Sequence, residues 1–304
     1  MTTIDESKPV NPFGDQYAIP EASQSDADKI DYDRWGRYAN LPGIPGVMDP
    51  GPLSRASTIA KVLPDTWNLD QWAKRQIVRG LQRKPALLDL ASGPRFNHES
   101  KHGKDLLNSI AATAMDEAGS HDGATAGTRF HDLAEHADRG EGILLDPSLS
   151  PDDLAMLDAY EAEMRRHSIK PVAEFIERVV CVPSLGIAGR FDRIYNDNGV
   201  LRIGDLKSQK WEPGLFDSIS LSVQLAIYSN ATHMLDMSVK PWKWVPMPKI
   251  DKTKGLVAWV PAVEPGKAEI HDVDLVFGWK MTKASVQVRE WRKAKGVVSR
   301  RAIM

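Results

Sequence analysis

Apolar residues recur at helical spacing in the first half of the chain, which predicts a series of amphipathic helices before any strand. The segment 66–84, TWNLDQWAKRQIVRGLQRK, carries apolar side chains on one stripe. Two further helices are expected, at about 104–117 and after GATAGT, where RFHDLAEHADRG follows. The segment SLSPDDLAMLDAYEAEMRRH has the features of a helix start, because Ser150 is suited to cap a helix and Pro151 to its first turn.

The pattern then changes to alternation, and three strands are expected in succession. KPVAEFIERVVCVP alternates and is rich in β-branched residues, and GIAGRFDRIYND and GVLRIGDLK follow it. NDNG lies between the last two segments and has the composition of a tight turn. The three strands are therefore expected to form a meander in which the last two are antiparallel neighbours.

The last third of the chain is expected to hold a helix at about 215–235, a hairpin and a final helix. The hairpin would join WKWVPMPKI to GLVAWVPAV through the polar loop DKTK. The final helix, at about 272–295, is amphipathic and basic. Helices followed by a block of strands, and then by a helix and further strands, favour an α/β domain around one sheet.

The composition of the N-terminal part differs from that of the rest. Residues 1–50 are rich in Pro, Asp, Ser and Gly, which predicts a flexible segment held to the body by Trp35 and Tyr38. Residues 51–120 are interpreted as a helical extension and 121–298 as the main domain, including the C-terminal basic helix. No apolar run approaches the ~18 residues of a membrane span, and the N-terminus lacks the apolar core of a signal peptide. We therefore expect a cytoplasmic protein with no membrane partner.

The net charge and the cysteine content limit which partners and which metal or disulfide sites the chain can have. The chain has 304 residues and a formal net charge of −2, so an anionic partner must be met by a local basic patch. Cys181 is the one cysteine, which excludes an internal disulfide, a four-cysteine zinc site and a cysteine-ligated iron–sulfur cluster. A single cysteine also fits a reducing cytoplasm.

Charged residues interrupt two of the predicted neighbouring strands. Asp205 and Lys207 stand two positions apart at the end of VLRIGDLK, and side chains two apart on a strand point the same way. Asp192 lies in the preceding strand, so the two carboxylates can meet at one end of the sheet. In one interpretation they bind Mg²⁺ or Mn²⁺, which offsets their repulsion, and Lys207 faces a phosphate. In the other, both carboxylates pair with nearby basic residues, Arg190 or Arg193 and Lys207, on a solvated rim.

Four short segments in order resemble the successive motifs of the PD-(D/E)XK nuclease superfamily: GTRFH, GRFDRI, IGDLK and QLAIY. The resemblance is closest to the RecB-like branch, which includes phage and CRISPR-associated exonucleases, in its cluster-free variety, and it covers roughly residues 127–231. It implies a restriction-endonuclease-like mixed β-sheet core flanked by helices, here with a helical N-terminal extension. It also implies a Mg²⁺- or Mn²⁺-dependent deoxyribonuclease, an exonuclease in phage DNA recombination or replication. If the protein is phage-encoded, its location would be the cytoplasm of the bacterial host.

The resemblance also implies a role for each matching residue near the acidic pair. His131 would be a metal ligand from the helix of GTRFH. Asp192 and Asp205 would be the acidic ligands, and the backbone carbonyl of Leu206 would add another. Lys207 would be the catalytic lysine and would act with the two aspartates. Taken without the resemblance, His131 is better explained as a solvated helix histidine.

DNA is the partner that the resemblance implies. Gln224 and Tyr228 stand four apart on the predicted helix after the strands and match a glutamine–tyrosine pair that helps to hold DNA near the site. By themselves they would be an ordinary amphipathic helix face. The final basic helix could neutralise phosphates, or it could be a solvated face. A recombination protein or a second copy of the chain could be a further partner.

One competing motif and one missing motif bear on these interpretations. HESKH at 98–102 fits the H-E-x-x-H pattern of zinc metalloproteases, which requires a helix, but its flanks favour a polar loop or a helix start. The chain has no G-x-x-x-x-G-K-[ST] phosphate loop, so no nucleotide-driven motor is expected in it. The alternative function from another class is a nuclease-like DNA-binding or recombination accessory protein that does not cleave.

Overall fold

The computed structural model describes residues 30–48, 51–92, 96–120, 122–141, 149–215 and 218–298, with backbone only for 122–126. The described residues divide into two compact units, one within 65–129 and the other within 30–64 and 130–298. The predicted flexible segment 1–50 lies outside the described residues except for 30–48. Within that stretch Tyr38 is buried as expected, whereas Trp35 is exposed.

The first unit is helical. Its helices are α2 (Trp67–Arg83), α3 (Ala86–Asp89), α4 (Lys101–Glu117) and the start of α5 (Asp122–Asp138). Helix α4 begins where the Ser100 hydroxyl accepts a hydrogen bond from the backbone N–H of Gly103 at 2.9 Å. His98 therefore precedes the helix that contains His102, and HESKH does not present two histidines on one helical face, as a zinc protease requires.

The described residues of the second unit build an eight-stranded mixed sheet. Its strands run in the order β6-β5-β2-β3-β4-β7-β8, and β1 pairs with β3. Their bounds are β1 (Ser54–Arg55), β2 (Ile169–Val182), β3 (Ile187–Asp197), β4 (Val200–Lys207), β5 (His233–Asp236), β6 (Lys243–Pro246), β7 (Lys254–Trp259) and β8 (Glu269–Asp274). The antiparallel run β2-β3-β4 confirms the predicted meander.

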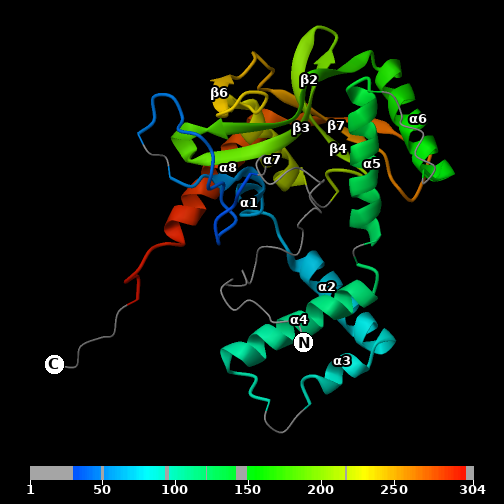
Figure 1. Ribbon diagram of the computed structural model, residues 1–304, viewed down its shortest axis with the longest axis vertical. Coiled ribbons are helices and arrows are strands. Elements are labelled where there is room, and N and C mark those ends of the chain that lie inside the picture. Colours follow the sequence, from blue (N-terminus) through cyan, green and yellow to red (C-terminus); the bar gives the residue numbers. More distant parts are fainter. Residues whose placement is uncertain are drawn as a thin grey trace. The chain divides into compact units, whose positions relative to one another are not determined.

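Helices cover both faces of this sheet (Figure 1). Helices α1 (Ala56–Ala60), α7 (Ser218–Ser229) and α8 (Leu275–Trp291) pack on one face in the largest apolar cluster. The C-terminal part of α5 and helix α6 (Pro151–Arg166) pack on the other face. Helix α6 begins with a capping box at Ser150, as its sequence predicts. The second unit thus has a mixed α/β fold of the restriction-endonuclease-like type, which confirms the predicted fold class.

The predicted hairpin of 242–250 with 255–263 is wrong. Strand β6 pairs with β5, whereas β7 pairs in parallel with β4 and antiparallel with β8. The physical reason lies in the side chains of β7, which are buried from Gly255 to Trp259. A continuous buried run suits an interior strand with a neighbour on each side and helices on both faces, rather than one arm of a surface hairpin.

Two helix ends also differ from prediction. The helix expected at 215–235 is α7, which ends at Ser229, because the Asn230 amide donates to the carbonyl of Ala226 at 2.9 Å and the chain turns into β5. The final helix starts at Leu275 rather than near 272. Residues up to Asp274 belong to β8, and the Asp274 carboxylate caps α8 by accepting from the backbone N–H of Phe277 at 2.9 Å.

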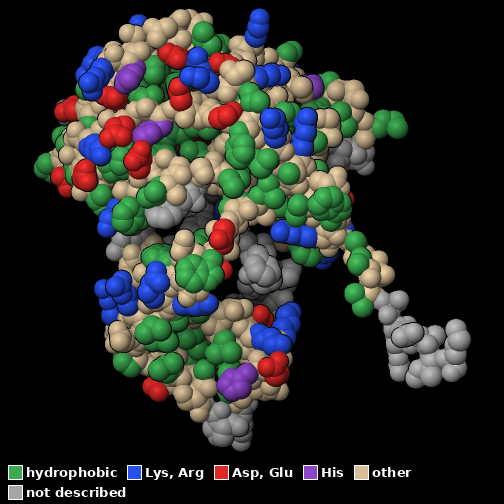
Figure 2. Space-filling model, turned by 180° about the vertical axis from the view of Figure 1, so that it is seen from behind, with side chains coloured by type: hydrophobic (Ala, Val, Ile, Leu, Met, Phe, Trp, Pro, Cys, Tyr) green, Lys and Arg blue, Asp and Glu red, His purple; other side chains and the backbone are tan. Residues whose placement is uncertain are grey.

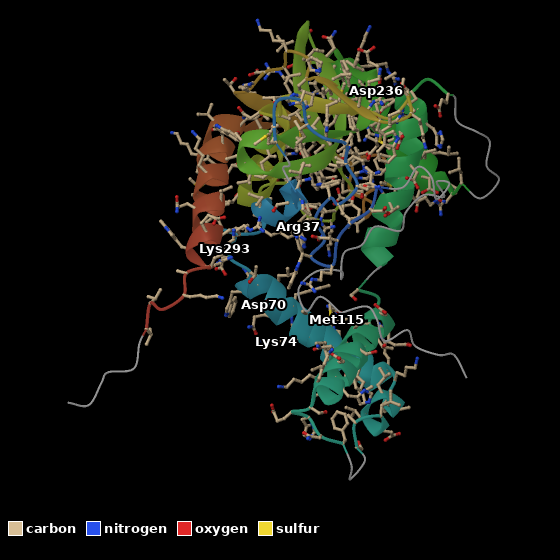
Figure 3. All side chains as sticks on the ribbon, turned by 60° about the vertical axis from the view of Figure 1, so that its left-hand side comes forward. Arg37, Asp70, Lys74, Met115, Asp236 and Lys293 are labelled. Carbon is tan, nitrogen blue, oxygen red and sulfur yellow. The ribbon has the colours of Figure 1, made fainter. Side chains whose placement is uncertain are left out.

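Acidic and basic side chains are interspersed over the face drawn in Figure 2. Lys293, just past the end of α8, forms an ion pair with Glu290 at 2.7 Å (Figure 3). The basic C-terminal helix thus has an acidic partner nearby, and its contact with DNA stays a prediction. Among the described residues, no helix has both the length and the apolar character that crossing a membrane demands.

Candidate catalytic site

Asp192 and Asp205 lie at the same end of two paired strands. Strands β3 and β4 pair from Asp197 with Val200 to Arg193 with Gly204. Asp192 and Asp205 are the next residues on each strand, where the regular pairing stops. The backbone N–H of Leu206 instead donates to the Asp192 carboxylate at 3.0 Å. The carboxylates of Asp192 and Asp205 and the backbone N–H of Leu206 therefore lie together where β3 and β4 stop pairing.

Two glycines let this end of the sheet close up. A Cβ on Gly204 would lie 2.1 Å from the Tyr195 ring, and a Cβ on Gly189 would lie 2.5 Å from the ring of Tyr228. Real Cβ atoms do not come so close to a ring carbon, so glycine is the residue that fits at each position. Gly189 of GIAG and Gly204 of IGDLK thus serve close packing beside the two aspartates.

Lys207 makes an ion pair with Asp205 at 2.6 Å. The Asp205 side chain is only 3% exposed, whereas Lys207 is partly exposed. Burial raises the pKa of the Asp205 carboxyl to about 6, although the Lys207 ammonium lowers it, and the nearby Asp192 charge adds to the increase. The pair is therefore not a solvated rim pair. It is a buried carboxylate joined to a lysine that reaches the surface.

Arg190 and Arg193, the two arginines that could pair with Asp192, form their ion pairs with other residues. Arg193 pairs with Asp138, and Arg190 pairs with Glu177 at 3.0 Å. Burial acts to raise the pKa of Asp192, but His131, Lys207 and Arg193 together hold it below its usual value. Asp192 is consequently ionised at neutral pH, and the alternative of simple ion pairs on a solvated rim does not describe it.

His131 of α5 faces the same carboxylate. Its Nδ1 atom is 3.8 Å from Asp192 Oδ2, and the ring is partly exposed. Burial lowers the pKa of His131, and Lys207 and Arg193 lower it further, while Asp192 acts against them. The imidazole is therefore neutral at pH 7, which is the form that binds a metal ion.

This donor set fits a divalent cation. Two carboxylates that lie together, one of them buried, repel each other unless positive charge lies between them. The structure meets part of that need with the Lys207 ammonium, which pairs with Asp205. Carboxylate oxygens, a backbone carbonyl at Leu206 and a neutral imidazole could hold Mg²⁺ or Mn²⁺ with water completing the coordination.

Gln224 and Tyr228 lie one turn apart on α7. The Gln224 amide donates to the Tyr228 hydroxyl at 3.0 Å. Tyr228 is buried, and burial and then the charge of Asp192 raise its pKa, so its hydroxyl stays protonated. Tyr228 thus forms part of the wall behind the aspartates, and Gln224 is the more exposed of the two. Contact of this pair with DNA stays a prediction.

A buried ion pair that the sequence did not reveal fixes α5 against β3. Arg193 and Asp138 form it, and both side chains are almost completely buried. The Tyr160 hydroxyl donates to the same Asp138 carboxylate at 3.0 Å, and it lies 3.4 Å from the hydroxyl of Tyr195. Because Asp138 and His131 share one helix, this network also positions the imidazole.

Glu177 is a second residue of the site that sequence reasoning missed. It lies on β2 just after a register irregularity, and the strand pairs on either side place it opposite Asp192. Its φ of 52° is rare for a residue with a side chain and costs about 1–3 kcal/mol. Burial, followed by the charge of Asp192, raises its pKa to about 8. A glutamate in a strand pattern, followed by Arg178 and flanked by the apolar residues Ile176 and Val179, was the signal available in the sequence.

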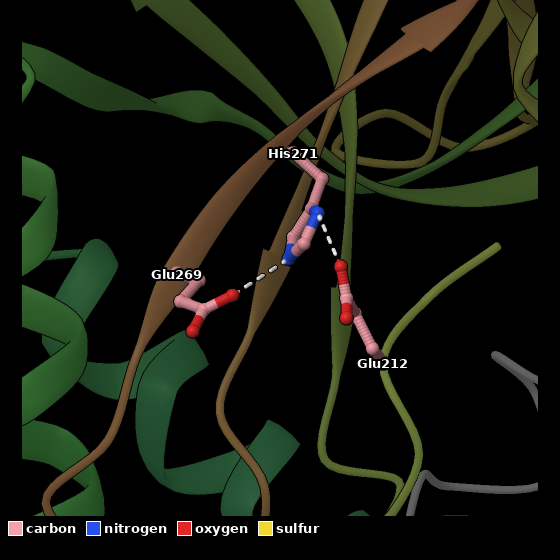
Figure 4. A group of neighbouring side chains, drawn as sticks. All are labelled: Glu212, Glu269 and His271. Atoms are coloured by element: carbon pink, nitrogen blue, oxygen red, sulfur yellow. Dashed lines mark ion pairs between the residues drawn. The ribbon is translucent and has the colours of Figure 1, made fainter. Parts of the chain in front are cut away.

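A separate group of possible ligands comprises Glu212, Glu269 and His271 (Figure 4). The two ring nitrogens of His271 face different carboxylates, Nδ1 toward Glu212 at 3.9 Å and Nε2 toward Glu269 at 3.3 Å. Lys267 also approaches Glu269, at 3.2 Å. A histidine placed between two carboxylates, with a lysine beside them, is accounted for by ion pairing without a metal ion.

Part of the chain matches a protein-family model. Residues 106–248 match the PD-(D/E)XK nuclease superfamily. A search of curated proteins gave no match. The matched segment contains each of the residues assigned above to the acidic site and its glutamine–tyrosine pair.

Proposed function

We propose that this protein is a Mg²⁺- or Mn²⁺-dependent exonuclease that hydrolyses DNA phosphodiester bonds, because residues 106–248 match the PD-(D/E)XK nuclease superfamily. One observation carries the proposal: a partly exposed lysine, two carboxylates and a neutral imidazole meet where β3 and β4 stop pairing. The order of the four sequence motifs supports the further proposals that it belongs to the RecB-like branch and acts in phage DNA recombination or replication.

The metal-holding residues in this proposal are His131, Asp192, Asp205 and the backbone carbonyl of Leu206. A bound divalent cation supplies Lewis-acid polarisation of the phosphate. The protein itself holds the two carboxylates in position for the cation. The Leu206 N–H fixes one carboxylate of the pair, and Lys207 fixes the other.

Lys207 is the proposed catalytic lysine. Its ammonium is held at 2.6 Å from the buried Asp205 carboxylate, which orients the side chain. An oriented cation at the surface of the site can stabilise negative charge that develops on a phosphate, or align the attacking water. Gln224 and Tyr228 would hold the DNA strand next to it. A recombination partner or a second copy of the chain would act together with this unit in the bacterial host cytoplasm.

A cleavage assay tests the proposal. Purified protein is incubated with end-labelled linear DNA and with closed circular DNA, in Mg²⁺, in Mn²⁺ and in chelator. Asp205→Ala and Lys207→Ala are run beside the wild type, with Asp272→Ala on an exposed part of β8 as the matched control. Metal-dependent loss of the linear DNA alone, absent in both site variants and kept in the control, supports an exonuclease.

Two results would contradict the proposal. Normal cleavage by Asp205→Ala or Lys207→Ala would show that the site is assigned to the wrong residues. Failure of the folded wild type to cut any DNA form, together with measurable DNA binding, would favour the non-cleaving accessory protein instead.

A further inference from the structure

The ion pair between Arg190 and Glu177 lies beside the acidic site and has no part in the roles described above. Arg190 is on β3, two residues before Asp192, and Glu177 is on the neighbouring strand β2. Alternate residues of a strand are about 6.6 Å apart and point to the same side. Arg190 is therefore next to the proposed metal ligand and on the same side of β3.

Arg190 is oriented but accessible. Its Nε atom lies 3.0 Å from Glu177 Oε2, and its side chain is 50% exposed, against 25% for Glu177. A guanidinium carries five N–H donors, and the contact with Glu177 accounts for the one on Nε. An arginine held by one edge in this way presents a planar fork, which matches the oxygens of a phosphate group.

The backbone at Glu177 is strained to make this arrangement. Its φ of 52° follows the register irregularity of β2, and such irregularities re-aim side chains next to functional sites. Glu177 stands opposite Asp192 in the pairing of β2 with β3, so it is placed beside a second carboxylate. A stabilising surface ion pair would not need to be placed against like charges in this way.

We infer that Arg190 binds a backbone phosphate of the DNA next to the one that is cleaved, and that Glu177 holds its guanidinium in position. The inference rests on the proposed function for its substrate class. It adds a phosphate contact that comes from β3 itself, two residues along the strand from Asp192. Arg190 would be a substrate-binding residue and Glu177 a positioning residue.

The test is the salt dependence of DNA binding by the full-length protein in chelator, where no cleavage takes place. Fluorescence anisotropy of a labelled duplex gives the dissociation constant between about 50 and 200 mM salt. The wild type is compared with Arg190→Gln, Arg190→Lys and Glu177→Gln. Arg178→Gln is the matched control, because Arg178 is next to Glu177 on β2 and donates to the Glu174 backbone carbonyl at 3.0 Å.

A lost phosphate contact has a defined signature. Arg190→Gln should lower the slope of log binding constant against log salt by about 0.9, the amount released per phosphate of a duplex. Arg190→Lys should keep the slope, since its charge remains. Glu177→Gln should keep the slope but weaken binding several-fold. Arg178→Gln should match the wild type, and thermal unfolding of each variant should show a folded protein.

Three outcomes would overturn the inference. They are an unchanged slope in Arg190→Gln, an equal change in Arg178→Gln, and no DNA binding by the wild type. Cleavage in Mg²⁺ is measured in parallel, so that the Arg190 phosphate contact and the nuclease activity can be contradicted separately. Cleavage with an unchanged slope overturns the Arg190 contact alone. A slope change without cleavage supports the contact and overturns the nuclease activity.

Discussion

Asp205→Asn is expected to abolish cleavage and, in the same protein, to increase stability at neutral pH when no metal is present. In the folded chain burial raises the pKa of the Asp205 carboxyl from 3.8 to about 6, even with the Lys207 ammonium beside it. Asparagine has nearly the same shape and carries no charge. The substitution therefore removes a group whose ionised form the folded chain disfavours, while it also removes a proposed metal ligand.

The sign and size of the effect follow from the pKa. A carboxyl that binds its proton more tightly in the folded chain lowers the free energy of unfolding as pH rises, because the unfolded chain loses its proton first. A shift from 3.8 to about 6 corresponds to at most about 3 kcal/mol, at about 1.36 kcal/mol per pKa unit. This loss begins near about pH 4 and is complete above about pH 7. The gain in Asp205→Asn should follow the same course.

Thermal unfolding in chelator from about pH 4 to about pH 8 measures this difference. Relative to wild type, Asp205→Asn should gain little at the acid end and at most roughly 10 °C in Tm at the neutral end. Asp272→Asn, at an exposed carboxylate paired with Lys254 at 2.7 Å, is the control and should show no such gain. A variant less stable than wild type at every pH, or a gain independent of pH, would refute the account of Asp205 as a buried carboxylate that costs stability.

Three further predictions concern the site and its support. Lys207→Met should retain metal binding, measured by calorimetry, but lose about 100-fold or more in turnover, because the oriented cation is gone. Asp138→Asn should lower the free energy of unfolding in urea by about 3–5 kcal/mol, since it leaves Arg193 buried without its partner; a loss below about 1 kcal/mol would contradict this. Gly204→Ala should destabilise by about 1–3 kcal/mol through a clash with a tyrosine ring, whereas Gly43→Ala, with open space around it, should be neutral.

The parts of the fold that could be predicted from sequence are those set by local rules. Strands β3 and β4 are joined by a turn in which Asn198 and Gly199 have φ values of 51° and 90°, the conformation that NDNG favours. A short turn fixes the register of the strands it joins. The adjacent placement of Asp192 and Asp205 follows from that register, so two residues of the site were accessible to reasoning from the residues alone.

The remainder depends on contacts between distant segments. The parallel pairing of β4 with β7 brings Lys207 beside Trp259, with all of α7 and two other strands between them in sequence. Arg193 and Asp138 are 55 residues apart. Nothing in the local sequence of either indicates the partner, because a charged residue finds a buried partner only when both elements have packed. The position of Glu177 depends in the same way on an irregularity in strand pairing.

Helix α5 carries the buried anchor Asp138 and the site residue His131 seven positions apart. Seven residues are close to two full turns, so the two side chains project from the same side of the helix at an axial distance of about 10 Å. Helix α5 is therefore anchored at the buried Arg193–Asp138 ion pair. A tilt of the helix by roughly 5° about this anchor would move the imidazole of His131 by about 1 Å. Displacements of that size can cost about 100-fold in rate, so the accuracy of the site is set two turns away from it.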